Sequence, residues 1–201
     1  MLCGIDEAGR GPLAGPVYVA AVVLGEGGRA IAGINDSKKL TEKKRDELAL
    51  LIKAEAVAWA IVAVDEATID AINILQATLR GMYLAYDQIR WQHMPPAHVN
   101  EIVIDGTQLP RDLIARCAKE RTRLVALPKA DGNDLDVGAA SILAKTARDH
   151  HMLEMDSRFP GYGFAEHKGY GTAAHMAAIE RLGPCAIHRK SFAPIAQYKL
   201  L

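Results

Sequence analysis

The sequence lacks an excess of charge of either sign, which excludes one simple kind of nucleic-acid binder. Its 201 residues contain 24 Lys and Arg against 24 Asp and Glu, so the formal net charge is zero. A generic histone-like polycation is therefore excluded, although local basic clusters can still contact a phosphate backbone. The length and a 50% hydrophobic content suit one domain with a buried core. We expect a single domain over 1–201, in which about 160–201 form a C-terminal extension of helices and loops.

Cysteine and long apolar runs are also scarce. Cys3, Cys117 and Cys185 are widely spaced and form no CxxC pair, so neither a zinc site nor a redox dithiol is indicated. We expect reduced thiols and a cytoplasmic protein. No basic segment followed by an apolar run stands near the N-terminus, so we expect no signal peptide. The longest apolar runs, near 16–24 and 56–64, have about nine residues, too few to span a bilayer.

The order of strand and helix patterns favours an α/β fold. Two apolar stretches flank a Gly/Pro-rich turn at the start of the chain, and further strand patterns then alternate with helical ones. This order is typical of a mixed central sheet flanked by helices, and 25–33 is expected to be a flexible loop. We expect strands at 2–6, 16–24, 56–64, 101–105 and 122–127, and helices starting after Thr41, at about 65–92, 111–119 and 134–156, and after Thr172.

Acidic residues stand at the ends of two predicted strands. Asp6 ends "LCGID", with Glu7 directly after it, and Asp105 ends "EIVID". Acids at strand ends of an open sheet can converge at one edge, where they repel one another unless a proton or cation intervenes. An all-oxygen cluster suits Mg²⁺ or Mn²⁺, and two such ions can promote phosphodiester hydrolysis. Each Asp alone also fits a turn or a helix cap.

Several longer motifs resemble one known family. The segment "GIDEAGRGPLAGPV" is similar to the signature of the type 2 ribonucleases H, the ribonuclease HII proteins. Five more blocks resemble the family in its own order: "NDSKKL", "IDG", "AASILAK", "YGFAEHKGY" and "HRKSFAP". The resemblance covers essentially the whole chain and implies a ribonuclease H-like three-layer fold. The related type 3 enzymes carry an N-terminal substrate-binding extension, which we do not expect before Asp6.

The resemblance implies a set of metal-binding acids. The family binds divalent metal, Mg²⁺ or Mn²⁺ and two ions during catalysis, through four acids that match Asp6, Glu7, Asp105 and Asp131. The fourth match is less direct, because Ala130 stands where the family usually has Gly. Asp136 is the alternative for this position, although an acid there also fits the first turn of the long helix.

Other motif residues match the family's substrate contacts. The resemblance implies that the backbone of the Gly9-Arg10-Gly11 loop contacts the 2′-hydroxyl of a ribonucleotide, since glycine lets a backbone approach closely. It also implies that Tyr170 packs near the sugar and favours an RNA-to-DNA junction. Basic and polar residues are expected to contact phosphates. These are Ser37, Lys38, Lys39, Lys145, Arg148 and Lys168, with Lys43, Lys44, Arg45, Arg189 and Lys190 as further members of basic surfaces.

The function implied is that of a metal-dependent endoribonuclease. It would hydrolyse the phosphodiester 5′ to a ribonucleotide in RNA–DNA hybrids or in duplex DNA, leaving 3′-hydroxyl and 5′-phosphate ends, in ribonucleotide excision repair and in removal of RNA primers and hybrids. Two rivals are a junction-resolving nuclease of the same fold and a hybrid-binding module without activity. We expect a monomer, and the C-terminal "QYKLL" resembles peptides that dock on bacterial sliding clamps.

Overall fold

A mixed five-stranded sheet forms the centre of the computed structural model, which describes residues 1–35, 37–92 and 99–200. The strand order is β3-β2-β1-β4-β5. The pairs β1–β2 and β2–β3 are antiparallel, whereas β1–β4 and β4–β5 are parallel. The strands are β1 (Leu2–Ala8), β2 (Val17–Val23), β3 (Ala58–Val64), β4 (Glu101–Asp105) and β5 (Arg123–Leu127), so all five predicted strands are confirmed.

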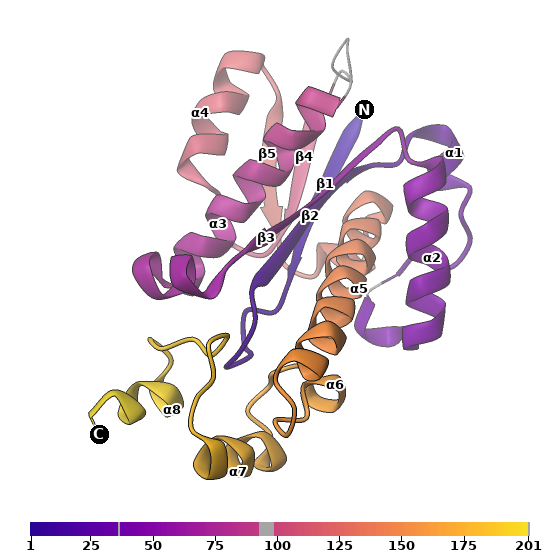
Figure 1. The fold of residues 1–201 in the computed structure, drawn as a ribbon. Coiled ribbons are helices and arrows are strands. Elements are labelled where there is room, and N and C mark those ends of the chain that lie inside the picture. The colour runs from indigo at the N-terminus through magenta and orange to yellow at the C-terminus, as the bar shows by residue number, and fades with distance from the viewer. Residues whose placement is uncertain (36, 93–98, 201) are drawn as a thin grey trace.

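Helices cover both faces of this sheet, as Figure 1 shows. On one face α3 and α4 pack over an apolar cluster that includes Ile5, Tyr86 and Leu113. On the other face α2 and α5 enclose a second cluster around Val22 and Leu48. The three-layer α/β arrangement with a mixed sheet is therefore confirmed. The helices are α1 (Gly25–Arg29), η1 (Ser37–Lys39), α2 (Glu42–Glu55), α3 (Glu66–Gln92), α4 (Arg111–Glu120), η2 (Ala130–Gly132), α5 (Leu135–Arg158), α6 (Phe164–His167), α7 (Ala173–Leu182), α8 (Ala193–Ala196) and η3 (Gln197–Leu200).

Local sequence explains where the long helices begin and how closely they pack. Thr41 and Thr172 cap α2 and α7 with their side-chain oxygens, and Asp134 caps α5 in the same way. Helix α5 lies so close to β1 that a Cβ on Gly4 would stand 2.1 Å from the carbonyl carbon of Asp136. Glycine in β1 therefore sets the depth of α5 against the sheet, and with it the place of every polar residue on that helix.

One prediction about local structure was wrong, and the helix predicted at about 65–92 is confirmed as α3 but has an interruption. The expected loop at 25–33 contains the short helix α1, because Asp136 accepts hydrogen bonds from the Leu24 amide and from the Arg29 guanidinium at its two ends. The expected helical region 65–92 is interrupted at Asn73, whose φ is 65° and ψ is 163°. The Asn73 carboxamide accepts from the Gln76 amide at 3.1 Å, so it caps a second helical segment.

The C-terminal segment has an apolar cluster of its own. Tyr162, Phe164 and Ile179 pack there with Met152 at the end of α5 and with Leu13 of the first loop, so this segment encloses the turn between β1 and β2. Figure 1 shows α6, α7 and α8 gathered below the sheet at that end. Within the described ranges, no helix combines the length and the apolar content needed to cross a membrane.

Candidate active site

Three carboxylates meet at one edge of the sheet. Ile5 pairs with Ile104 across the parallel strands β1 and β4, so the next residues, Asp6 and Asp105, lie side by side. Asp131 lies in the turn after β5, where the Ala130 amide donates a hydrogen bond to the Asp105 carboxylate at 2.8 Å. One carboxylate oxygen from each Asp lies within 4.8 Å of the others, close enough for all three to hold one cation. An all-oxygen donor set of this kind suits Mg²⁺ or Mn²⁺.

Burial makes this cluster electrostatically costly without a cation. Asp6 is only 3% exposed and Asp131 only 6%. Burial, and then the neighbouring carboxylates of Glu7 and Asp105, raise the pKa of Asp6 well above its usual range. A hydrogen bond from Ser141 and one from the Glu7 amide, at 2.7 Å, oppose this rise in the pKa of Asp6. Like charges held together in a low-dielectric site favour binding of a divalent ion, so the residues present fit a metal centre.

Glu7 stands beside the three aspartates but outside the 4.8 Å group found among the described residues. One of its oxygens pairs with the Arg10 guanidinium at 3.3 Å, and the other is buried with no hydrogen-bond partner. Burial raises the pKa of the Glu7 carboxyl, and Arg10 opposes this increase. A buried oxygen without a donor suits a cation ligand, and Arg10 here pairs with a carboxylate.

The structure distinguishes the two candidates for the fourth acid. Asp131 lies with Asp6 and Asp105, whereas Asp136 is on the first turn of α5. Asp136 is fully buried, and its carboxylate binds the Leu24 amide at 2.9 Å and the Arg29 guanidinium. Asp136 thus joins α5 to α1 and is absent from the acidic group.

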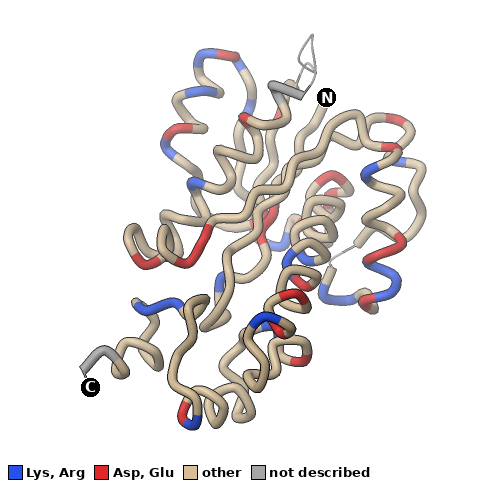
Figure 2. The backbone as a smooth tube through the Cα atoms, in the orientation of Figure 1, with Lys and Arg blue, Asp and Glu red and all other residues tan. Residues whose placement is uncertain are grey.

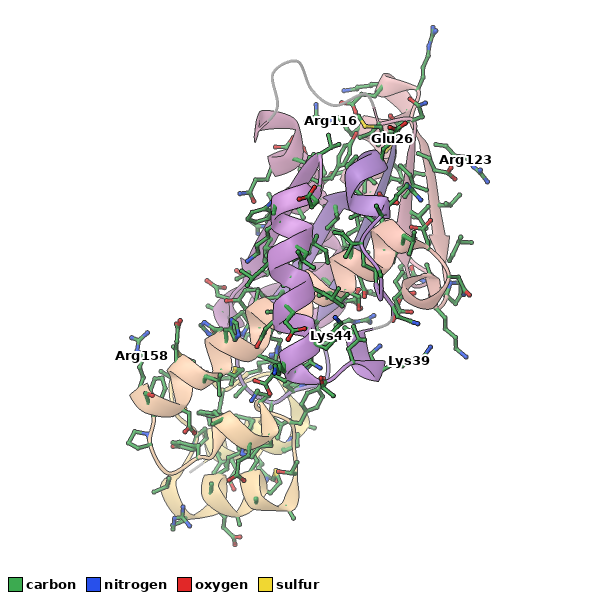
Figure 3. The ribbon with its side chains drawn as sticks, turned by 90° about the vertical axis from the view of Figure 1, so that its right-hand side faces the viewer. Glu26, Lys39, Lys44, Arg116, Arg123 and Arg158 are labelled. Carbon is green, nitrogen blue, oxygen red and sulfur yellow. The ribbon has the colours of Figure 1, made fainter. Side chains whose placement is uncertain are left out.

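Basic residues of η1 lie next to the acids. The Lys38 ammonium is 3.9 Å from a carboxylate oxygen of Asp131, and the Lys38 side chain is 78% exposed. The Lys39 ammonium is 3.7 Å from where a Cβ on Gly132 would stand, one residue beyond Asp131. Figure 2 shows this basic stretch at the start of α2, and Figure 3 shows Lys39 and Lys44 at the same end of that helix. Cationic groups are therefore available to a phosphate that approaches the carboxylates.

Ser37 and Arg45, two other residues of the expected basic surface, are buried. The Ser37 hydroxyl is 2.9 Å from the Ser141 hydroxyl, which in turn lies next to Asp6. The Arg45 guanidinium donates to the Leu40 carbonyl at 2.8 Å and pairs with Asp149 at 2.9 Å. Both side chains have little exposed area, and both hold the η1 turn against α5.

A groove of about 510 Å³ runs along the first loop and lies next to the acidic group, since its lining includes Glu7, the neighbour of Asp6, and Lys38, the neighbour of Asp131. It is lined by Glu7, Ala8, Gly9, Arg10, Gly11, Ser37, Lys38, Arg45, Ser141, Lys145 and Tyr170. Tyr170 is 45% exposed, and one of its ring carbons is 3.6 Å from where a Cβ on Gly11 would stand. The Lys145 ammonium pairs with Asp149 at 2.7 Å beside the groove. Most of the candidate substrate residues predicted from the sequence therefore face one surface.

Two buried arginines hold the loop that forms the groove wall. Arg148 donates to the carbonyls of Ala14, Pro16 and Lys168 at 2.9–3.3 Å. Arg189 is fully buried and donates to the carbonyls of Gly9, Arg10 and Gly15 at 2.5–2.9 Å. Both arginines were expected to face phosphate. Their observed partners are backbone carbonyls, because this loop has few partners of its own for its C=O groups.

Lys168 is also engaged within the protein. It adopts a left-handed backbone conformation with φ of 50°, and its ammonium donates to the Ala165 carbonyl. Its own carbonyl accepts from Arg148. The structure thus places Lys168 in the turn that carries Tyr170, beside the groove wall.

A ribonuclease H-like sheet with a carboxylate cluster at its edge and a cationic groove beside it defines an endonuclease of the RNase H type. The family model for Ribonuclease HII matches residues 3–195, and the chain belongs to that family. It is 48% identical to the Ribonuclease HII of Laribacter hongkongensis (strain HLHK9) over 194 residues, or 96% of this chain and 91% of that protein. It is 47% identical to the Ribonuclease HII of Halorhodospira halophila (strain DSM 244 / SL1), again over 96% of this chain and 91% of that protein.

The fold comparison agrees with the sequence comparison. The RNase HII in the structure of the PCNA:RNase HII complex from Archaeoglobus fulgidus superposes with a TM-score of 0.76 at 26% identity. The match covers 99% of this chain and 97% of that one. The family predicted from the motifs is therefore confirmed.

Proposed function

We propose that this enzyme cleaves the phosphodiester on the 5′ side of a ribonucleotide, either within an RNA–DNA hybrid or as a single ribonucleotide in duplex DNA, and leaves 3′-hydroxyl and 5′-phosphate ends. One observation carries the proposal. Glu7, the Gly9–Gly11 loop and Tyr170 line the same groove, which begins beside the acidic group of Asp6, Asp105 and Asp131. Groups suited to a sugar and groups suited to a metal would thus face the same strand of a bound duplex.

The sugar must be recognised at close range, since only the 2′-hydroxyl distinguishes a ribonucleotide from its DNA counterpart. A Cβ on Gly11 would meet only Tyr170 across the groove, so the backbone at Gly11 lies open there and can approach a hydroxyl. The carbonyls of Gly9 and Arg10 are held by Arg189, which fixes the shape of the loop around that backbone. The Tyr170 ring beside Gly11 offers a flat apolar face to the next sugar. A following deoxyribose, which lacks a 2′-hydroxyl, fits that face best, so we propose a preference for RNA-to-DNA junctions.

The carboxylates of Asp6, Glu7, Asp105 and Asp131 would hold two divalent ions. Bound there, Mg²⁺ or Mn²⁺ supplies an activated water and neutralises charge on the phosphate and the leaving oxygen. The residues of the chain have separate roles. Ser141 orients Asp6 through a hydrogen bond, and Lys38, whose ammonium is 3.9 Å from a carboxylate oxygen of Asp131, would contact the phosphate. No side chain of the site needs to form a covalent bond to the substrate.

The test is cleavage of a duplex that carries one ribonucleotide in otherwise DNA strands, with the product ends mapped. Cleavage 5′ to the ribonucleotide that requires Mg²⁺ or Mn²⁺, together with an intact all-DNA control, supports the proposal. Asp105→Asn should abolish cleavage but still bind the duplex. A junction-resolving nuclease would ignore the ribonucleotide, and a binding module would leave the duplex uncut. Either result would contradict the proposed function.

We also propose roles in ribonucleotide excision repair and in removal of RNA from hybrids, carried out by a monomer in the cytoplasm. Three free cysteines support a reducing compartment. For a docking partner we propose a sliding clamp bound by the C-terminal "QYKLL". Gln197–Leu200 form η3, and Leu201 lies outside the described residues. A chain truncated after Ala196 should lose clamp binding and keep its activity on short duplexes.

A further inference from the structure

A chain of buried hydrogen bonds ends at the backbone of Tyr170. The Tyr170 carbonyl is 2.9 Å from Nδ1 of His175, and Nε2 of His175 is 3.1 Å from Nε2 of His188. Nδ1 of His188 in turn accepts from the Cys185 amide at 2.9 Å. His175 is fully buried and His188 is 1% exposed, so both rings are shielded from bulk solvent. We call His175 and His188 the histidine pair.

The partners at both ends favour one direction for the hydrogen bonds of the histidine pair. A carbonyl can only accept, so Nδ1 of His175 carries the proton and its Nε2 has the lone pair. Nδ1 of His188 lies 2.9 Å from the Cys185 amide and farther, at 3.3 Å, from the Cys185 carbonyl. A proton on that Nδ1 would leave two Nε2 lone pairs facing each other across the histidine pair, so we assign the lone pair to Nδ1 of His188 and the proton to its Nε2. These two assignments meet correctly, because Nε2–H of His188 then donates to Nε2 of His175. Burial, the first cause of each shift, lowers the pKa of His175 and lowers that of His188 to about 4, which keeps both rings neutral near pH 7.

The same short segment also holds the Gly9–Gly11 loop. Arg189 follows His188 directly and donates to the carbonyls of Gly9 and Arg10 at 2.5 and 2.9 Å. The backbone of His188 pairs with Ala14 in an isolated antiparallel bridge. One dipeptide therefore reaches both walls of the groove, the loop through Arg189 and Tyr170 through the histidine pair.

We propose that His188 is a positioning residue that sets where Tyr170 stands relative to the Gly9–Gly11 loop, and that it thereby controls discrimination at the RNA-to-DNA junction. The inference rests on the proposed function. Nε2–H of His188 donates to Nε2 of His175, and Nδ1–H of His175 donates to the Tyr170 carbonyl. The position of the His188 ring therefore determines the position of the Tyr170 backbone. Two other backbone hydrogen bonds of Tyr170 are local, from its amide to the His167 carbonyl and from the Thr172 amide to its carbonyl, and the Arg148 guanidinium lies 5.9 Å from the centre of its ring. The histidine pair is the hydrogen-bonded connection from Tyr170 to the segment around Cys185 and His188.

Two amide variants separate the two ends of His188. In His188→Gln the side-chain NH₂ can occupy the place of Nε2 and still donate to His175. In His188→Asn the carboxamide oxygen can occupy the place of Nδ1 and still accept from Cys185, but it does not reach His175. Both variants remove the ring, so any general loss of packing is common to them. The readout is the ratio of kcat/KM on a single-ribonucleotide duplex to kcat/KM on a uniform RNA–DNA hybrid.

We expect His188→Asn to lower this ratio at least about fivefold, the effect of one lost hydrogen bond, and His188→Gln to keep it within about twofold of the wild type. Added to Tyr170→Ala, which should itself lower the ratio, His188→Asn should cause no further decrease. His175→Gln, which loses the donor to Tyr170, should behave like His188→Asn and replaces it if that variant does not fold.

An unchanged ratio in His188→Asn, an equal loss in His188→Gln, or an additive loss in the Tyr170→Ala background would each overturn the inference while leaving the proposed function intact. A wild-type enzyme that does not cut at a single ribonucleotide would instead overturn the proposed function, and the inference with it.

Discussion

Arg189 donates a hydrogen bond to the carbonyl of Gly9 at 2.5 Å, although the two residues are 180 positions apart in the chain. The same guanidinium also binds the carbonyls of Arg10 and Gly15 at 2.9 Å. Burial, and then the charge of Arg148, lower the pKa of Arg189 to about 9, so it remains protonated at neutral pH. The loop beside the acidic group is thus shaped by a charge from the opposite end of the chain.

Arg189→Lys should therefore destabilise the protein and weaken substrate binding. A lysine ammonium cannot bind three separate carbonyls in the planar arrangement of a guanidinium, so at least one buried carbonyl loses its donor. We expect a loss of about 3 kcal/mol in the free energy of unfolding and a raised KM. The measurement is urea denaturation with steady-state kinetics. Lys190→Ala, a change at the exposed neighbour, is the control and should stay within about 0.5 kcal/mol.

The two glycines of the first loop should respond differently to alanine. A Cβ on Gly9, whose φ is 96°, would stand 2.0 Å from Nε of Arg148, whereas one on Gly11 would meet only Tyr170, at 3.6 Å. Gly9→Ala should lower the free energy of unfolding by more than about 2 kcal/mol, from strain and the displaced arginine. Gly11→Ala should fold like the wild type and lose preference for the ribonucleotide. Equal melting temperatures of the two variants would contradict this account.

The contacts of the two buried arginines could not be predicted from the sequence. Motif and composition identify Arg148 and Arg189 as cations near a nucleic-acid site, and a cation is expected to be exposed. Their partners are backbone carbonyls in 9–16 and Lys168, and no local pattern encodes a contact over such a separation. The histidine pair was missed for the same reason. The "HKGY" and "HRKSFAP" blocks were noted, but a hydrogen bond between their neighbourhoods is visible only in the folded chain.

The proximity of Asp6 and Asp105 was easier to predict, because the carboxyl ends of neighbouring parallel strands lie at the same edge of a sheet. Asp6 and Asp105 follow paired residues of parallel strands, so their proximity follows from the strand pattern. For the fourth acid the sequence favoured Asp131 and left Asp136 as the alternative, since both stand close to the start of the same helix. The close contact of α5 with Gly4 turns Asp136 toward α1 and leaves Asp131 at the edge.

The matched variants Asp131→Asn and Asp136→Asn should separate these two roles. Asp131→Asn removes a charge from the acidic group, so we expect activity to fall by at least about a thousandfold with the fold intact. Asp136→Asn leaves the group unchanged but weakens the bonds to Leu24 and Arg29, so we expect activity to persist and stability to fall by about 1–3 kcal/mol. Cleavage assays at saturating Mn²⁺ and thermal melts decide the matter. An inactive Asp136→Asn beside an active Asp131→Asn would reverse the assignment.

Removing the acid from a buried ion pair next to the η1 turn should lower the stability of the protein. Asp149 accepts from Arg45 at 2.9 Å and from Lys145 at 2.7 Å, and Arg45 also holds the Leu40 carbonyl. Asp149→Asn leaves the buried Arg45 charge without its counter-ion, so we expect a loss of about 3–5 kcal/mol in unfolding free energy. Asp46→Asn, at an exposed pair with His150, is the matched control and should cost less than about 1 kcal/mol.

The neutral state of His188 predicts a dependence of stability on pH. Burial, and then the neighbouring His175, lower the pKa of His188 from 6.5 to about 4. The unfolded chain therefore binds a proton before the folded one does, so the stability due to neutral His188 is complete above pH 6.5 and is lost as pH falls through about 4. His188→Gln cannot titrate there. The unfolding free energy of the wild type minus that of His188→Gln should therefore decrease between pH 6.5 and pH 4, measured by urea denaturation without added metal. Acids and histidines away from the histidine pair titrate alike in both proteins, and the neutral Gln keeps a donor to His175. A constant difference would therefore show that His188 is not buried in its neutral form.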